Sequence, residues 1–376
     1  MNRFARKARS NKNFFKSLPL LVIITCQSCV SPKTVENPPS PQIQNKAPQY
    51  NKKNSNDEIQ NIVQTIDQDR LKKHVQKLTQ IGSRLRKRPV AFRELNQANY
   101  NPNAQTQKMI YIKNKLQSYG YKVQYEKGFG RIDLPGMKPV NLVVTKKGTQ
   151  KSRDVIELGA HYDTMANPGA DDNASGVAGV LEVARALSKI KLKRTVRMIF
   201  YDLEELGMIG SEHHVKKIKQ QRNEKFAGAY VFEMIGFSDK TPNSQRSPVR
   251  IPHVFDPPTT GDFIALMADR KSHQLRINFE NVSKKYVKSL KFYGTSIAGK
   301  IPDAYRSDHA SYWRAGFKAI MITDTANFRN KNYHQKTDTI QTLDFEFMTR
   351  VVQAMTATLI TYAQPAETTP SRINIQ

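Results

Sequence analysis

The sequence predicts an α/β fold, in which a mixed, mainly parallel central sheet lies between two helical layers as an α/β/α globule. Short apolar runs of strand length alternate with longer segments whose apolar residues recur at helical spacing. This alternation is typical of strand–helix–strand units and a parallel sheet. Acidic residues and histidines follow several of the apolar runs. Because the carboxyl ends of parallel strands open onto one crevice, we expect these residues to meet there.

Helical spacing governs the start of the folded region. From 59 to 81, apolar residues recur every three or four positions, which predicts an amphipathic helix or a pair of helices. Gly82 ends this segment, because glycine readily adopts the backbone conformation that closes a helix. After an irregular loop at 85–103, helical spacing returns at 104–119 and stops at Gly120.

From residue 121 on, strands and helices alternate. Strands are expected where short apolar or β-branched runs occur, at 121–125, 141–145, 155–160, 196–201, 227–233 and 319–324. Helices are expected where the apolar residues follow a period of three to four, at 175–190, 211–221, 259–274 and 342–362. In the helix expected at 259–274, Phe263, Leu266 and Met267 would face inward.

The composition limits the class of protein. The chain has 376 residues, 38% of them hydrophobic and 24% charged, with a formal net charge of +28. These values are typical of a globular protein, and the length allows one large domain or two small ones. A strong positive charge favours polyanions, but no nucleic-acid-binding module is recognisable, so nucleic acid is not expected. A solvated basic surface is the simplest interpretation, and anionic lipid headgroups or anionic cell-wall polymers are the partners we would otherwise expect.

The first 29 residues differ from the rest of the chain. A basic region without acids precedes a short apolar run at 18–25, and the chain's two cysteines, Cys26 and Cys29, follow it. The run is too short to span a bilayer, which takes about 20 apolar residues. This order predicts an export signal at 1–29 and resembles a bacterial lipoprotein signal, in which a cysteine is lipidated. We expect an exported envelope protein tethered to a membrane by an N-terminal lipid, with simple secretion as the alternative.

Two polar segments flank the expected domain. Residues 30–56 are rich in Pro, Asn, Ser, Gln and Lys and have few large apolar side chains. Such a segment cannot bury enough apolar surface to fold, so it is expected to be a flexible linker. Residues 363–376 form a polar tail. The folded domain is therefore expected at 57–362.

Five separated blocks of residues point to metal chemistry. They are His161-Tyr162-Asp163, 171–176, Glu204-Glu205, 233–236, and Tyr333-His334 followed by Asp338-Thr339. Two histidines among several carboxylates suit zinc, which binds His nitrogen and Asp or Glu oxygen. Adjacent carboxylates at the end of a buried strand repel each other and need a cation. One of the pair can bind metal while the other stays free to move protons.

The order and spacing of these blocks resemble the bacterial two-zinc aminopeptidase family over residues 57–362. The resemblance implies a phosphorylase/hydrolase-like α/β fold, two zinc ions per chain, and hydrolysis of peptides that have a free N-terminus. It also implies the following roles: His161 and Glu233 bind one zinc, Glu205 and His334 bind the other, Asp172 bridges them, Glu204 is the general acid and base, Tyr333 stabilises the oxyanion, and Asp163 and Asp338 support the ligands.

Two other functions stay open. Glutaminyl cyclases share this fold but use one zinc and usually lack the Asn after the bridging Asp, so Asn173 and the pair Glu204-Glu205 favour hydrolysis. A non-catalytic envelope protein could use the fold for binding, but such proteins generally lose ligands, and every ligand position here holds a residue able to bind metal.

Several other histidines have simpler interpretations. His213 and His214 lie in a helix-like segment and are expected at its surface or boundary. His253 and His273 belong to no block of ligand-type residues and are expected to be structural. His309 follows Ser307 and Asp308 in a Ser-Asp-His sequence, which either shapes the site or forms a packed loop.

Overall fold

The computed structural model describes residues 52–83, 101–129, 137–150 and 153–363. The export signal expected at 1–29, most of the linker expected at 30–56, and the tail from 364 on lie outside the described residues. The first helix begins at Lys52, inside the segment expected to be linker. None of the helices in the described ranges is long and apolar enough to cross a membrane.

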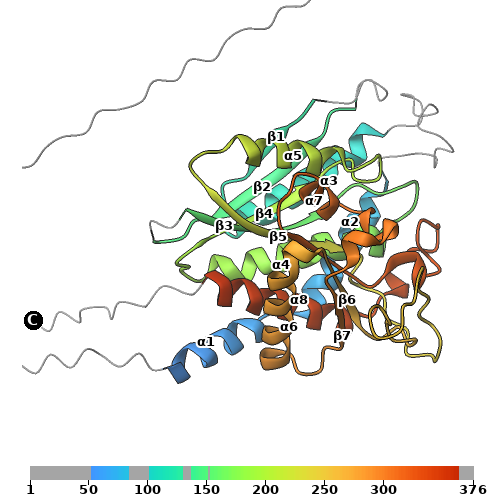
Figure 1. The fold of residues 1–376 in the computed structure, drawn as a ribbon. Helices are drawn as coiled ribbons and strands as arrows, with labels where there is room; N and C mark the ends of the chain where they lie inside the picture. Colours follow the sequence, from blue (N-terminus) through green and yellow to red (C-terminus); the bar gives the residue numbers. More distant parts are fainter. Residues whose placement is uncertain (1–51, 84–100, 130–136, 151–152, 364–376) are drawn as a thin grey trace, which may run out of the picture. The chain divides into compact units, whose positions relative to one another are not determined.

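In the described part of the chain, an eight-stranded sheet forms the centre of the domain (Figure 1), with the strand order β1-β2-β4-β3-β5-β8-β6-β7. The strands are β1 Gln124–Lys127, β2 Val140–Lys146, β3 Asp154–His161, β4 Thr195–Tyr201, β5 Lys225–Glu233, β6 Ile264–Ala268, β7 Phe292–Thr295 and β8 Ala319–Thr323. β4, β3, β5 and β8 are parallel neighbours, whereas β1, β2 and β6 each make antiparallel pairs. The prediction of a mixed, mainly parallel sheet is confirmed.

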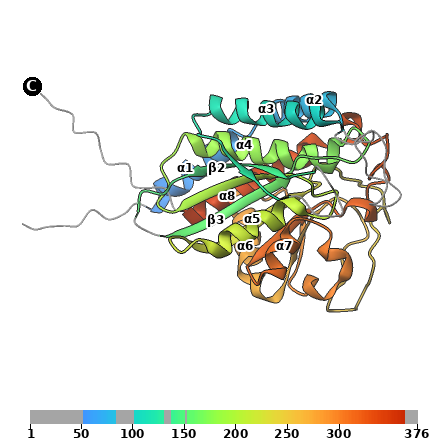
Figure 2. The same ribbon diagram turned by 90° about the horizontal axis from the view of Figure 1, so that it is seen from above.

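Helices cover both faces of this sheet. Figure 2 shows α2, α3 and α4 on one side and α5 and α7 on the other. The helices are α1 Lys52–Gln64, α2 Gln68–Ile81, α3 Pro102–Ser118, α4 Gly176–Ser188, α5 Ile209–Gln220, α6 His273–Tyr286, α7 His309–Arg314 and α8 Phe345–Ala363. Short helical turns occur at Ala170–Ser175, Arg270–Ser272, Ala298–Lys300, Pro302–Tyr305, Ala326–Phe328 and Ile340–Thr342. One apolar core packs six helices, α1, α2, α3, α4, α6 and α8, against the sheet. A second core packs α5 and α7 against its other face.

Local capping explains the N-terminal helices. The Asp67 side chain accepts the Arg70 amide at 2.8 Å and starts α2, so the region 59–81 is a helix pair rather than one helix. The Asn101 side chain caps α3 in the same way. Gly82 and Gly120 follow α2 and α3 with φ of 81° and 89°, which confirms them as the residues that end these segments.

The prediction of a helix at 259–274 is wrong. Ile264–Ala268 is strand β6, which pairs with β8 and β7, and α6 begins only at His273. Because β6 lies inside the sheet with both faces covered, most of its residues are buried and no polar–apolar alternation marks it as a strand. The spacing of Phe263, Leu266 and Met267 therefore imitates one face of a helix.

His214 is buried, which corrects the expectation that it lies at the surface or boundary of its helix. Its Nδ1 is 2.7 Å from Glu126 Oε2, and its Nε2 is 3.2 Å from Glu157 Oε2. Burial lowers the pKa of His214, but the two carboxylates more than offset this effect and raise it to about 9. The charged imidazole ties α5 to strands β1 and β3. Arg197 and Tyr312 also donate hydrogen bonds to Glu157.

We expect the domain to lose stability as the pH rises through about 9, where folded His214 deprotonates. Its folded pKa lies above the value of about 6.5 in an unfolded chain, so its stabilisation is complete below about pH 6.5 and is lost as the pH rises through the folded pKa. Each pKa unit corresponds to about 1.4 kcal/mol, which gives a loss of about 3 kcal/mol in the free energy of unfolding. Urea unfolding between pH 6 and 10 measures this loss.

The His214→Gln variant should be less stable below pH 6.5 and should lack most of the alkaline decline. His213→Gln changes the neighbouring, partly exposed histidine and is the matched control, which should keep the decline. An alkaline decline in His214→Gln as steep as that of the wild type would contradict the assignment.

Candidate metal centre

The candidate site lies where parallel strands end at one edge of the sheet. β3 ends at His161, β5 ends at Glu233, and the acidic segment 202–205 follows β4 directly. Because β4, β3 and β5 are parallel neighbours, these three ends adjoin. Asp172 lies in the turn before α4, and His334 comes from the loop between β8 and α8. The sheet therefore brings together residues that are far apart in the sequence.

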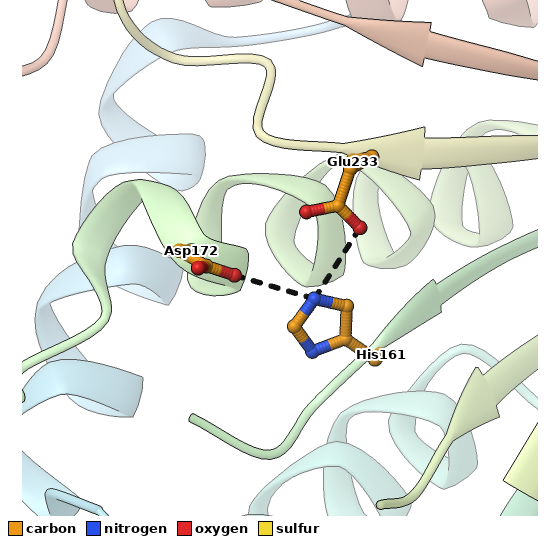
Figure 3. A group of neighbouring side chains, drawn as sticks. All are labelled: His161, Asp172 and Glu233. Carbon is orange, nitrogen blue, oxygen red and sulfur yellow. Dashed lines mark ion pairs between the residues drawn. The ribbon is translucent and has the colours of Figure 1, made fainter. Parts of the chain in front are cut away.

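His161 faces two carboxylates from different elements (Figure 3). Its Nε2 lies 3.3 Å from Asp172 Oδ1 and 3.4 Å from Glu233 Oε2. All three residues are buried. Both carboxylates point at the same ring nitrogen, so the three side chains offer one nitrogen and two oxygens to a single ion.

A second group forms around His334. Its Nε2 lies 3.1 Å from Asp172 Oδ2 and 3.0 Å from Glu205 Oε2. Asp172 thus turns one oxygen toward each histidine, which is the arrangement of a carboxylate that bridges two ions. The structure brings together all five residues predicted as ligands.

The donor set fits divalent metal ions. Among the described residues, neither Nε2 of His161 nor Nε2 of His334 has a hydrogen-bond partner. A buried polar atom without a partner is destabilising, and a cation between the side chains would satisfy both nitrogens. Burial, and then the charge of Asp172, raise the pKa of Glu205 to about 7, which shows how strongly these carboxylates disfavour being charged together without a cation. Imidazole nitrogen with carboxylate oxygen is the donor set that zinc prefers.

Glu204 is the carboxylate beside the two groups that belongs to neither of them. Its Oε2 lies 3.8 Å from His161 Nε2, and its side chain is only 11% exposed. Burial raises the pKa of Glu204 well above its usual range; His161 opposes this shift, and Glu233 adds to it. Glu204 therefore lies beside both groups of candidate metal donors without belonging to either of them.

Asp163 supports the site from behind. Its two carboxylate oxygens accept the backbone amides of Glu204 at 3.1 Å and Glu205 at 3.2 Å. Its Oδ1 also lies 3.5 Å from Nδ1 of His161, the ring nitrogen that faces away from the metal site. A carboxylate in this position fixes the orientation of the imidazole and of both glutamates.

Asp338 supports a different ligand through the backbone. Its carboxylate accepts the amide of Asp171 at 2.9 Å and the amide of Asp172 at 3.2 Å. Burial, and then the charge of Asp171, raise the pKa of Asp338 to about 8. The side chain therefore fixes the turn that carries Asp172.

Tyr333 packs directly on a predicted metal ligand. Its ring stacks on His334 with centroids 3.8 Å apart and an interplanar angle of 19°. The Arg306 guanidinium donates a hydrogen bond to the Tyr333 hydroxyl at 3.2 Å. The phenolic oxygen accepts this bond, so the phenolic hydrogen remains available for another acceptor.

Two supporting residues were not assigned roles in the site by the sequence. Asn173 donates to the carbonyl of Phe232 at 2.9 Å and accepts the amide of Met234 at 3.1 Å, which fastens the turn of Asp172 to the end of β5. Ser307 donates to Glu233 Oε2 at 2.6 Å and fixes that carboxylate. The Ser-Asp-His sequence was the one feature of the sequence from which a role of Ser307 in the site could have been predicted. His309 instead bonds the carbonyl of Ala304 at 2.6 Å, so one end of that sequence serves the site and the other packs the loop.

Three residues at the site have a strained backbone. Leu203, Met234 and His334 have φ of 58°, 53° and 57°, in the left-handed region that residues other than glycine seldom adopt. Leu203 precedes Glu204, and Met234 follows Glu233. Such conformations persist only where the surrounding structure holds them, and they are common at functional sites.

Comparison with known proteins identifies the family. Residues 141–359 match the sequence profile of Peptidase family M28. The chain belongs to this family. The matched region contains both groups of candidate metal-binding residues as well as Glu204 and Tyr333.

Curated relatives of this M28 peptidase cover parts of the chain. It is 36% identical to the Escherichia coli protein YfbL over 214 residues, which are 54% of this chain and 65% of YfbL. It is 34% identical to Aminopeptidase YwaD of Bacillus subtilis over 100 residues, which are 26% of this chain and 22% of YwaD. The chain thus spans less than two thirds of the length of each of these two relatives.

Solved structures confirm the fold. The Legionella pneumophila LapA aminopeptidase matches with a TM-score of 0.62 and 22% identity, covering 82% of this chain and 75% of LapA. A Porphyromonas gingivalis glutaminyl cyclase matches with a TM-score of 0.57 and 18% identity, covering 79% and 98%. Because both identities are below 25%, the two structures bear on the fold alone, and they show that this chain has the same α/β fold.

Proposed function

We propose that this M28 peptidase is a zinc-dependent aminopeptidase, which binds two zinc ions and removes N-terminal residues from peptides. Asp172 carries the proposal, because its two oxygens face His161 and His334 at 3.3 and 3.1 Å, and a further carboxylate completes each group. The aminopeptidase names of YwaD and LapA support the same activity. Donor groups for two ions, rather than one, favour hydrolysis over the single-zinc chemistry of a glutaminyl cyclase.

In the proposed reaction, each residue of the site has a separate role. When bound, zinc would lower the pKa of a coordinated water to about 7 and would polarise a carbonyl. Glu204 accepts the proton of the attacking water at its carboxylate and later donates it to the leaving amine. Tyr333 donates its phenolic hydrogen to the developing oxyanion. Asp163 keeps Glu204 and Glu205 in place through their amides.

An apolar cleft beside the metal centre defines the expected substrate side chain. Glu233 and Tyr333 form part of the wall of this cleft. The rest of the wall includes Phe255, Phe263, Met267, Tyr293, Met321 and Phe328. Apolar pockets next to reacting atoms bind apolar groups. We infer that the preferred N-terminal residue is large and apolar.

A substrate screen tests the function directly. The zinc-loaded chain should hydrolyse aminoacyl-p-nitroanilides that have a free amine, with leucine and phenylalanine ahead of alanine, and should fail on their N-acetylated forms. Cyclisation of N-terminal glutamine without hydrolysis would replace the proposal with the glutaminyl cyclase alternative. If neither reaction occurs in protein that holds zinc, a binding function on the same fold takes its place.

The Met267→Gln variant is expected to weaken the preference for large apolar residues. Met267 lines the cleft and is partly buried, so an amide of similar size would lose its hydration whenever an apolar side chain enters. We expect the ratio of kcat/KM for leucine over alanine substrates to fall by about 10-fold, within the range for such discrimination. Ile110→Gln, at an exposed apolar residue of α3, is the control and should keep the ratio. An unchanged ratio in Met267→Gln would place the substrate side chain elsewhere.

A further inference from the structure

Exposed basic side chains gather at the edge of the sheet opposite the metal centre. They lie in or directly beside three connections, β2–β3, α4–β4 and α5–β5, at the amino ends of the parallel strands that carry His161 and Glu233 at their carboxyl ends. We call this surface the basic edge and define it by Lys147, Lys189, Lys191, Lys219, Arg222 and Lys225, which are all exposed.

The three connections contact one another, so the basic edge is one continuous surface. The amide of Thr149 donates to the carbonyl of Leu192 at 2.8 Å, which joins β2–β3 to α4–β4. The amide of Lys225 donates to the carbonyl of Arg153 at 2.8 Å, which joins α5–β5 to the start of β3. The charges therefore act together on whatever lies against this edge.

Most of this charge is not neutralised within the domain. The acids of these connections are already paired: Asp154 lies 3.9 Å from the ammonium of Lys225, and Glu224 lies 2.5 Å from Arg197. Within the ranges that the structure describes, Lys189 and Lys191 have no acidic side chain at ion-pair distance. At the opposite edge, the segments 161–176 and 202–211 contain no lysine or arginine, and basic residues such as Arg306 and Lys331 lie in the later loops around Tyr333.

Both ends of the described chain lie on this side of the domain. The carbonyl of Ala363, the last residue of α8, accepts the amides of Lys193 and Arg194 at 3.1 Å each. Figures 1 and 2 both show the start of α1 on the same side as the end of α8 and the β2–β3 turn. Lys52, the first described residue, and Ala363, the last, therefore both lie on the side of the basic edge.

We propose that the basic edge docks the domain on an anionic lipid bilayer and turns the metal centre and its cleft away from the lipid. Clustered lysine and arginine are attracted to anionic headgroups over about one Debye length, roughly 8–10 Å. None of the large apolar side chains that are exposed in the described ranges belongs to these connections, so the contact is electrostatic and without insertion. The same absence leaves no exposed aromatic residue there for stacking on nucleic acid bases. A bilayer also suits the sequence of the 51 residues before Lys52, which contains the apolar run and both cysteines.

Vesicle sedimentation of the full chain tests the proposal. The variant Lys189→Gln/Lys191→Gln/Arg222→Gln should bind phosphatidylcholine vesicles containing phosphatidylglycerol at least about 10-fold more weakly than the wild type. Lys72→Gln/Lys73→Gln/Lys77→Gln removes the same charge from the exposed face of α2 and should stay within about twofold of the wild type. Vesicles without phosphatidylglycerol should show no difference among the three proteins. Equal losses in both triple variants would overturn the proposal, because net charge alone would then explain binding.

Two further measurements check the partner and the orientation. Duplex DNA that displaces the wild-type chain from the vesicles at equal phosphate concentration would overturn the choice of a lipid partner. In a Cys26→Ser/Cys29→Ser background, a fluorophore on Gln221→Cys at the basic edge should be quenched by a headgroup-located quencher, and one on Lys331→Cys near Tyr333 should not. Equal quenching at both positions would overturn the orientation. Neither measurement requires peptidase activity, so both stand apart from the proposed function.

Discussion

The Glu204→Gln variant is expected to keep its zinc and to lose turnover by about 10²–10⁴-fold. Glu204 lies 3.8 Å from His161 Nε2 but belongs to neither group of metal-binding side chains. The amide therefore removes the proton acceptor without removing a metal donor. Steady-state kinetics on a free-amine anilide, together with elemental analysis of zinc per chain, measure the two quantities separately.

Glu212→Gln makes the same chemical change in α5, outside the metal centre, and should leave zinc and turnover unchanged. Near-normal turnover in Glu204→Gln would show that another group moves the proton. Loss of zinc from that variant would show instead that Glu204 is a ligand.

The Asp172→Asn variant is expected to lose metal as well as activity. The two oxygens of Asp172 face His161 and His334 at 3.3 and 3.1 Å, and an amide can offer an oxygen to only one of these groups. The loss of zinc affinity should exceed the about 10–100-fold expected for a residue that only supports a ligand. Competition with a chromophoric chelator measures the affinity, and a smaller rise in Tm on adding zinc is the second readout.

The exposed Asp57 of α1 provides the control for this change, since Asp57→Asn should keep zinc affinity and activity. If Asp172→Asn retained two zinc ions with unchanged affinity, Asp172 would not be the bridge.

The sequence could predict the metal centre because its ligands lie next to elements with clear patterns. His161 and Glu233 end apolar runs that the structure confirms as β3 and β5. Glu204 and Glu205 follow a third run, β4, in the same parallel sheet. Once those runs are interpreted as parallel strands, their carboxyl ends must adjoin, and the ligand types select the chemistry.

The features that the sequence did not reveal depend on contacts between distant residues. β6 is identified as a strand only by its pairing with β8, because burial on both faces removes the alternation of polar and apolar residues. His214 is buried only because Glu126 and Glu157, 88 and 57 positions away, supply its charge partners. Ser307 reaches Glu233 across 74 positions. Neither the period nor the local chemistry of a segment specifies these pairings; for Ser307, the Ser-Asp-His sequence marked the loop but not its contact with Glu233.

The spread of the metal donors along the chain determines when the protein can acquire its metals. Both groups need Asp172, and the turn that carries it is held by Asp338, which lies 166 positions later. The second group also needs His334, so a nascent chain that ends before this residue lacks a donor of that group. Because the unfolded chain offers no formed site, metal loading must follow the folding of nearly the whole domain. Under the proposed function, unfinished or misfolded copies would carry no hydrolytic activity, and folding would control when peptide cleavage begins.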